Sequence, residues 1–140
     1  MHRFEEIQDL REAFAESPDN IPLLWILIRK MRVVKESHFE LKPLVERMMI
    51  KFPDDLELKE ILIEIYFYQE KFASSIVIWE DIDDIDALGP DSIVILSKCY
   101  LRLGNVEESK RLFLFLVEFW PGHLDREPEA FFRIPIKKFP

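Results

Sequence analysis

Residues 66–79 read YFYQEKFASSIVIW, and residues 100–113, which come 34 positions later, read YLRLGNVEESKRLF. Both stretches begin with a tyrosine, continue through a polar turn to a serine, and end on a large aromatic residue. The positions that match are Tyr66 and Tyr100, Phe72 and Val106, Ser75 and Ser109, Trp79 and Phe113, and Ile82 and Leu116. Agreement at several positions of one period predicts a chain built from repeated structural units.

Each repeated unit also has the signals of α-helices. Apolar residues recur at spacings of three and four, which predicts amphipathic helices; one such run is Leu58, Ile61, Leu62, Ile65 and Tyr66. Residues that favour helix starts precede these runs; they are Asn20, Asp54, Asp55 and Asp91, with Pro22 and Pro90 nearby. Gly104-Asn105 predicts the end of one helix and the start of the next, and Asn105 with Glu108 resembles a capping pair.

Together these features resemble the tetratricopeptide repeat family, whose members stack antiparallel pairs of helices. The fullest match is residues 90–121, where large, small and turn residues fall as the family requires; they are Leu96, Ser97, Tyr100, Gly104, Ser109, Phe113, Leu116 and Pro121. Residues 56–89 match nearly as well, but have Glu70-Lys71 in place of the turn glycine. Residues 22–53 match less well, because Arg29 and Arg32 stand where the family has a small residue and an aromatic residue.

The resemblance implies an all-α fold, a right-handed superhelical solenoid of about three helix pairs. We expect a single domain over residues 1–140, with a leading helix in 1–20, repeats in 21–55, 56–89 and 90–122, and a short C-terminal capping tail in 123–140. A helix pair cannot bury its apolar face alone, so equivalent side chains should recur where pairs meet. Ser75 and Ser109 are expected to let helices approach closely, with Trp79 and Phe113 filling the space beside them.

Size and composition indicate a soluble protein. The 140 residues are 49% hydrophobic, and the net charge of −8 disfavours binding to nucleic acid or to an anionic membrane. The charged N-terminal stretch does not resemble a signal peptide, and the longest apolar run, residues 112–117, is too short to span a bilayer. The single cysteine, Cys99, lies among apolar residues with no base beside it, which favours a buried structural thiol in a reducing compartment. We therefore expect a cytoplasmic protein with no membrane insertion.

No pattern in the sequence predicts catalysis, a cofactor, a metal site or a small-molecule substrate. The three histidines are scattered, and His38 falls in a predicted turn. The nearest approach to a metal site is His123 with Asp125 and Glu127, for which an ordinary polar loop is the better interpretation. The acidic run 79–91 fails as an EF-hand loop, because leucine and isoleucine occupy two ligand positions. A solvated helix end is its default interpretation, with an electrostatic docking patch as the alternative.

The first helix of each tetratricopeptide pair lines a concave groove, and the resemblance implies that this groove receives a peptide or a helix. Within each helix the candidate residues share one face; they are Leu23, Ile26, Lys30 and Val33, then Glu57, Glu60, Glu64 and Phe67, and last Asp91, Val94, Lys98 and Leu101. The residues with which some family members clamp a terminal carboxylate are absent. The glutamates favour a ligand with cationic and apolar residues, and a merely solvated helix face is the alternative.

A second candidate surface lies at the end of the last predicted helix. Residues 112–120 are apolar except for Glu118, although the last helix of a stack needs a polar outer face. The predicted apolar C-terminal surface is Leu114, Phe115, Phe119, Trp120, Phe131 and Phe132. Residues 127–140, EPEAFFRIPIKKFP, are one candidate cover, and a second copy of the chain or a different partner is the other. Their cations would also suit the acidic groove of a neighbouring molecule.

From the resemblance and the absence of catalytic patterns we expect a non-catalytic protein–protein interaction module, an adaptor or assembly factor that binds a partner peptide or helix. The main alternative is a dedicated chaperone that shields one aggregation-prone client, such as a secretion or filament subunit. A small regulatory subunit of an enzyme is a third possibility, in which the partner would carry the activity.

Overall fold

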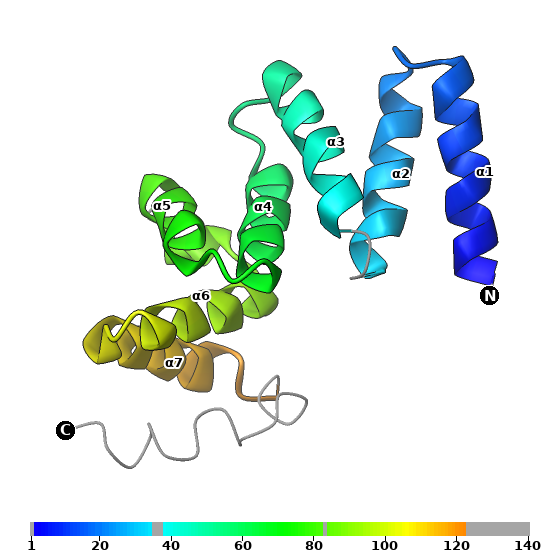
Figure 1. The fold of residues 1–140 in the computed structure, drawn as a ribbon. Coiled ribbons are helices and arrows are strands. Elements are labelled where there is room, and N and C mark those ends of the chain that lie inside the picture. The colour runs from blue at the N-terminus through cyan, green and yellow to red at the C-terminus, as the bar shows by residue number, and fades with distance from the viewer. Residues whose placement is uncertain (1, 35–37, 83, 123–140) are drawn as a thin grey trace. The chain divides into compact units, whose positions relative to one another are not determined.

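The chain is all-α throughout the part that the structure describes (Figure 1). A computed structural model describes residues 2–34, 38–82 and 84–122, with side chains from Glu6 onwards. These residues contain no strand, which confirms that the fold is all-α as predicted. The elements are α1 (His2–Glu16), α2 (Ile21–Val33), α3 (His38–Lys51), α4 (Leu56–Tyr68), α5 (Phe72–Ile82), the 3-10 helix η2 (Ile85–Ala87), α6 (Pro90–Arg102) and α7 (Val106–Phe119).

The helices belong to two compact units, Met1–Ile61 and Leu62–Pro140, and the boundary between them falls within α4. In the first unit α1 packs on α2, and α2 packs on α3. In the second unit α5 packs on α6, and α6 packs on α7. Each of these packed pairs is consecutive in the sequence, as short connections favour.

The core of the first unit is made of apolar stripes on successive helices. On α2 the buried residues share one helical face; they are Leu24, Leu27, Ile28 and Met31. α1 adds Ile7 and Phe14, and α3 adds Leu41, Val45 and Met48. Full burial of a side chain of this size contributes about 2 kcal/mol. Such stripes therefore hold this unit together, and the polar faces of the helices are left for solvent or partners.

Helix α6 is the centre of the second unit. Residues Ser92–Ser97 are all buried, so this helix has neighbours on several sides. Ile76 and Trp79 of α5 and Leu112 and Leu116 of α7 belong to the same core. A helix that is buried nearly all round requires an apolar sequence with small residues at its closest contacts. The sequence of α6 meets both conditions.

The serines that repeat at 34 residues join the helices of two hairpins. Ser75 Oγ of α5 donates a hydrogen bond to Ile63 O of α4 (2.8 Å). Ser109 Oγ of α7 donates the equivalent bond to Ser97 O of α6 (2.8 Å), and Ser97 Oγ donates in return to Ser109 O (3.0 Å). Both Ser75 and Ser109 are fully buried. The predicted close approach of helices at these two serines is therefore confirmed, and the hydroxyls do more than leave space, because they bind the facing backbone.

The turns of the same two hairpins share one hydrogen-bond pattern. In each turn two backbone N–H groups beyond the helix donate to carbonyls of its last turn, a Schellman motif. The four bonds are Gly104 N to Leu101 O, Asn105 N to Tyr100 O, Glu70 N to Phe67 O and Lys71 N to Tyr66 O, with lengths of 2.8 to 3.0 Å. The motif needs one residue in the left-handed region, which is Gly104 (φ +83°) in one turn and Glu70 (φ +60°) in the other.

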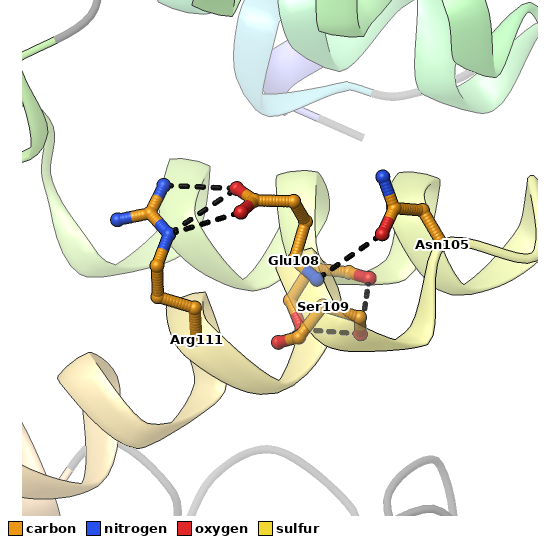
Figure 2. A network of polar contacts seen from close by, with 5 residues as sticks. Asn105, Glu108, Ser109 and Arg111 are labelled. Atoms are coloured by element: carbon orange, nitrogen blue, oxygen red, sulfur yellow. Dashed lines mark hydrogen bonds and ion pairs between the residues drawn. The ribbon is translucent and has the colours of Figure 1, made fainter.

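Three predicted helix starts are confirmed by their caps. Asn20 Oδ1 accepts a hydrogen bond from Leu23 N (3.1 Å), and Asp55 caps α4 in the same way. Asn105 Oδ1 accepts from Glu108 N (3.3 Å), as Figure 2 shows. The Glu108 carboxylate binds the Arg111 guanidinium at 3.0 Å (Figure 2), so only the asparagine half of the predicted capping pair is made.

Two sequence predictions about helix ends are wrong. Asp91 does not precede its helix, because α6 begins at Pro90 and the carboxylate lies in its first turn, where the helix dipole favours a negative charge. His38 does not lie in a turn, because it is the first residue of α3 and is buried. Residue 38 precedes the buried Leu41 and Val45 by three and seven positions, so the histidine falls on the buried face of the helix.

Candidate protein-binding surfaces

The predicted binding stripe on α2 is largely exposed. Ile26 and Val33 are 47% and 57% exposed, and Leu23 is half-buried. Lys30 Nζ lies 3.3 Å from a carboxylate oxygen of Glu6 on α1, so its charge is already paired. An open hollow of about 330 Å³ is lined by Glu6, Ile7, Lys30 and Val33. The structure therefore puts two of the predicted residues beside α1, a helix that the sequence prediction had not connected with the groove.

The first glutamate of the predicted row on α4 has a cationic neighbour. Glu57 receives two hydrogen bonds of 2.9 Å from the Arg29 guanidinium of α2, and this contact lowers the pKa of Glu57 although partial burial opposes the shift. Glu60 and Glu64 are half-buried, and each has an interaction of its own. The negative charge that would attract a cationic ligand is thus partly compensated within the chain.

The stripe on α6 is more buried than the sequence indicated. Val94 is 3% exposed and belongs to the core of the second unit, so it cannot line a groove; the prediction ignored that α6 has neighbours on several sides. Asp91 is exposed, and Lys98 and Leu101 are half-buried. Lys98 Nζ lies 6.0 Å from the ring centroid of Phe67, at the limit of a cation–π contact. These two residues, predicted on neighbouring stripes, are brought together.

An aromatic cluster beside this pair was not predicted. Phe67 contacts Tyr68 edge-on at 5.1 Å between ring centroids and Phe72 at 5.8 Å. The Arg102 guanidinium lies 5.7 Å from the Phe72 ring, one helical turn beyond Lys98. The sequence did contain a signal, since three aromatic residues at 66–68 are followed by a fourth at 72.

The described part of the apolar C-terminal surface exposes several large side chains. Leu114 is 50%, Phe119 58% and Trp120 42% exposed. Phe115 is half-buried, since it packs against the core of the second unit and its ring lies 4.6 Å from that of Phe119. Phe131 and Phe132, which were assigned to the same surface, lie outside the described residues.

A hollow opens between the end of α7 and the 3-10 helix η2. It has a volume of about 240 Å³ and a mainly apolar wall; its lining residues are Ile85, Asp86, Leu88, Phe115, Phe119 and Trp120. Asp84 Oδ1 accepts a hydrogen bond from Asp86 N (3.2 Å) and so caps η2. This hollow was not predicted, because residues 79–91 were interpreted as a solvated helix end. Ile85 and Leu88, apolar within an acidic run, were the available signal.

Helix α3 has an exposed apolar stripe that was not predicted either. Phe39 and Ile50 are 81% and 82% exposed, and Pro43 is exposed between them. The spacings of four and seven place all three on one face, opposite the stripe that α3 buries. The signal available in the sequence was the spacing of four and seven between these three residues.

Cys99 is buried, as predicted for a structural thiol. Loss of contact with water raises the pKa of its thiol to about 11, so the thiolate needed for nucleophilic attack does not form at neutral pH. Among the described residues, no three His, Cys, Asp or Glu side chains are grouped as metal ligands would be.

No protein-family model, curated protein or solved structure matches the chain. Within the described residues, no helix is both long enough and apolar enough to cross a bilayer.

Proposed function

We propose that the chain is a non-catalytic protein-binding module, an adaptor or assembly factor that takes up a peptide or helix of a partner protein. The observation that supports this most is the exposure of Phe119 and Trp120 beside an open, mainly apolar hollow. Large aromatic side chains of this kind dominate the binding energy of protein interfaces. Each 100 Å² of apolar surface removed from water would contribute about 2.5 kcal/mol before the costs of association.

The chemistry around the hollow supports a partner segment with aromatic or aliphatic and cationic side chains. Asp86 lines the hollow, Asp84 is exposed beside it, and Glu118 is exposed next to Phe119. Cationic residues flanking an apolar anchor would complement these carboxylates. The exposed Ile26 and Val33 of α2 support a second contact region on the predicted groove stripe.

A dedicated chaperone for one aggregation-prone client is the second candidate function. The observation that favours it is the exposed stripe of Phe39, Pro43 and Ile50 on α3, which adds apolar surface to that of α7. An adaptor needs one defined site for a short segment, whereas a chaperone needs several apolar surfaces for an extended client.

A capture experiment with matched variants separates these functions. Tagged wild-type chain, Phe119→Asp and Ile50→Asp are compared by quantitative mass spectrometry of co-purifying proteins from the source cells, after circular dichroism has confirmed equal helix content. An adaptor should lose its partner with Phe119→Asp and keep it with Ile50→Asp. A chaperone should lose its client with both. Retention of every captured protein by both variants would reject the α7 surface as the binding site.

A further inference from the structure

Acidic side chains are frequent in the two stretches of sequence that form the hollow at the end of α7. Residues 79–91 and 115–122, which provide its walls and their flanks, contain acidic side chains and no lysine or arginine. Asp84 and Asp86 belong to η2 at the rim, and both are exposed. A segment that brings cations and an aromatic ring together would therefore complement both the wall and the rim.

The size of the hollow fits one aromatic side chain. Its volume of about 240 Å³ exceeds the roughly 150 Å³ of an apolar protein cavity that admits benzene. Phe115, Phe119 and Trp120 provide aromatic wall on the α7 side, where a ring can pack edge-on or offset. Ile85 and Leu88 provide aliphatic wall on the η2 side.

The chain itself contains a segment of this composition. Residues 131–139 read FFRIPIKKF, with three cations, three phenylalanines and no acidic residue. The described residues end at Gly122, two positions after Trp120 of the hollow. Eight residues lie between Gly122 and Phe131, and the connection from one to the other spans at most about 30 Å. The connection is thus long enough to return to the hollow and short enough to keep the segment near it.

We propose that the hollow beside Phe119 and Trp120 is the docking site of residues 131–139 of the same chain. An aromatic ring of the segment would enter the hollow, and Arg133, Lys137 and Lys138 would face the carboxylates of the rim. Tethering keeps the local concentration of the segment in the millimolar range, so weak contacts suffice. The inference rests on the proposed function, because a partner that uses the α7 surface would have to displace this segment.

Photo-cross-linking in the purified full-length chain tests the docking. The photoreactive residue p-benzoylphenylalanine replaces Phe119 in one sample and Val77, an exposed apolar residue of α5, in the control. We expect cross-links from position 119 to residues 131–139, at the mass of a single chain and with a yield that does not depend on protein concentration. The control position should give several-fold less of this product.

Charge variants test the role of the rim. Replacing Arg133, Lys137 and Lys138 with glutamate should lower the cross-link yield from position 119 several-fold, whereas Lys137→Arg with Lys138→Arg should preserve it. Products at the mass of two chains would overturn the same-chain assignment in favour of a second copy. A yield from position 119 no higher than that from position 77 would overturn docking altogether. Because no partner is present, this result is independent of the capture experiment, and either proposal can fail alone.

Discussion

The hairpins α4–α5 and α6–α7 make the same contacts with partly different residues. Each has a serine hydroxyl bound to a backbone carbonyl of the preceding helix, and each has a Schellman turn. The α4–α5 hairpin has Ile63 where α6–α7 has Ser97. It also has Glu70 where α6–α7 has Gly104. The comparison teaches that the hydroxyl-to-carbonyl bond forms with a single serine, without the reciprocal bond of α6–α7, and that the turn geometry persists even without its glycine.

The α2–α3 segment shows where the comparison ends. One period before Ile63, α2 has Arg29, an exposed residue that binds Glu57 and lies 4.6 Å from the ring of Trp25. One period before Ser75, α3 has the buried Leu41. Leu41 has no hydroxyl, so the hydroxyl-to-carbonyl bond of the later hairpins has no counterpart between these two positions. The side chain of Arg29 makes a surface ion pair instead.

The largest effect is expected from removing the aromatic residue that each hairpin buries. Trp79→Ala and Phe113→Ala should each lower the free energy of unfolding by about 3–5 kcal/mol, because each leaves a cavity in a packed region. Urea denaturation followed by circular dichroism measures the change. Val77→Ala, at an exposed position of α5, is the control and should stay within about 0.5 kcal/mol of wild type. Equal effects of Val77→Ala and Trp79→Ala would contradict the packing described.

The two hairpins should differ in how their stability depends on pH, because α6 has the ionisable Cys99 where α4 has Ile65. Burial raises the pKa of Cys99 from 9.0 to about 11. Because the folded pKa is the higher one, the stabilisation is complete below pH 9 and is lost as the pH rises to 11. The loss should reach about 2 kcal/mol, and Cys99→Ala should show a smaller decrease over the same range. Identical pH profiles of the two proteins would refute this assignment.

Loss of the serine hydroxyls should destabilise both hairpins by a smaller amount. Ser75→Ala removes one buried hydrogen bond and should cost about 1 kcal/mol. Ser109→Ala should cost somewhat more, because Ser97 Oγ, which lies 3.1 Å from Ser109 Oγ, loses a polar neighbour as well. Ser74→Ala on the half-buried side of α5 is the matched control. If Ser75→Ala and Ser74→Ala have the same urea midpoint, the Ser75 hydrogen bond makes no net contribution to the stability of the fold.

Replacing the residue with positive φ should change stability in opposite directions in the two turns. Gly104→Ala should destabilise by about 1 kcal/mol, since residues with a Cβ disfavour the left-handed region. No atom lies within 4 Å of the position that this Cβ would take, so the cost is conformational. Glu70→Gly relieves the same strain but frees the unfolded chain, so it should raise the melting temperature only slightly. A decrease with Glu70→Gly would mean that the carboxylate makes a compensating contact.

The smallest effect on stability is expected from breaking the ion pair between Arg29 and Glu57. Arg29→Met should lower stability slightly at neutral pH and low salt, and the difference should vanish in 1 M salt. The Arg29 contact lowers the pKa of Glu57 from 4.5, so its contribution is present above that pH and is lost as the pH falls through the lowered value. Glu57→Gln should reproduce the Arg29→Met result. A salt-independent difference would point to packing against Trp25 as the cause.

Local signals in the sequence were sufficient to predict the helices, three of their caps and the close approach of helices at Ser75 and Ser109, but not the hydrogen bonds of the two hydroxyls. These features depend on residues within one helix or on the fixed 34-residue period. The exposure of Arg29 and the burial of Val94 could not be obtained in that way, because they depend on how each helix is rotated against its neighbours. The hollow at η2 was missed for a related reason, since its walls come from segments that are thirty residues apart in the sequence.

The reciprocal hydrogen bonds between Ser97 and Ser109 restrict the rotation of α7, the last helix that the structure describes. Each joins a side chain of one helix to the backbone of the other, so turning α7 about its axis would break both together. Phe119 and Trp120 are thereby presented in a fixed orientation to α6. A molecule that docks on them meets a preorganised surface, and little conformational entropy is lost from this side of the interface.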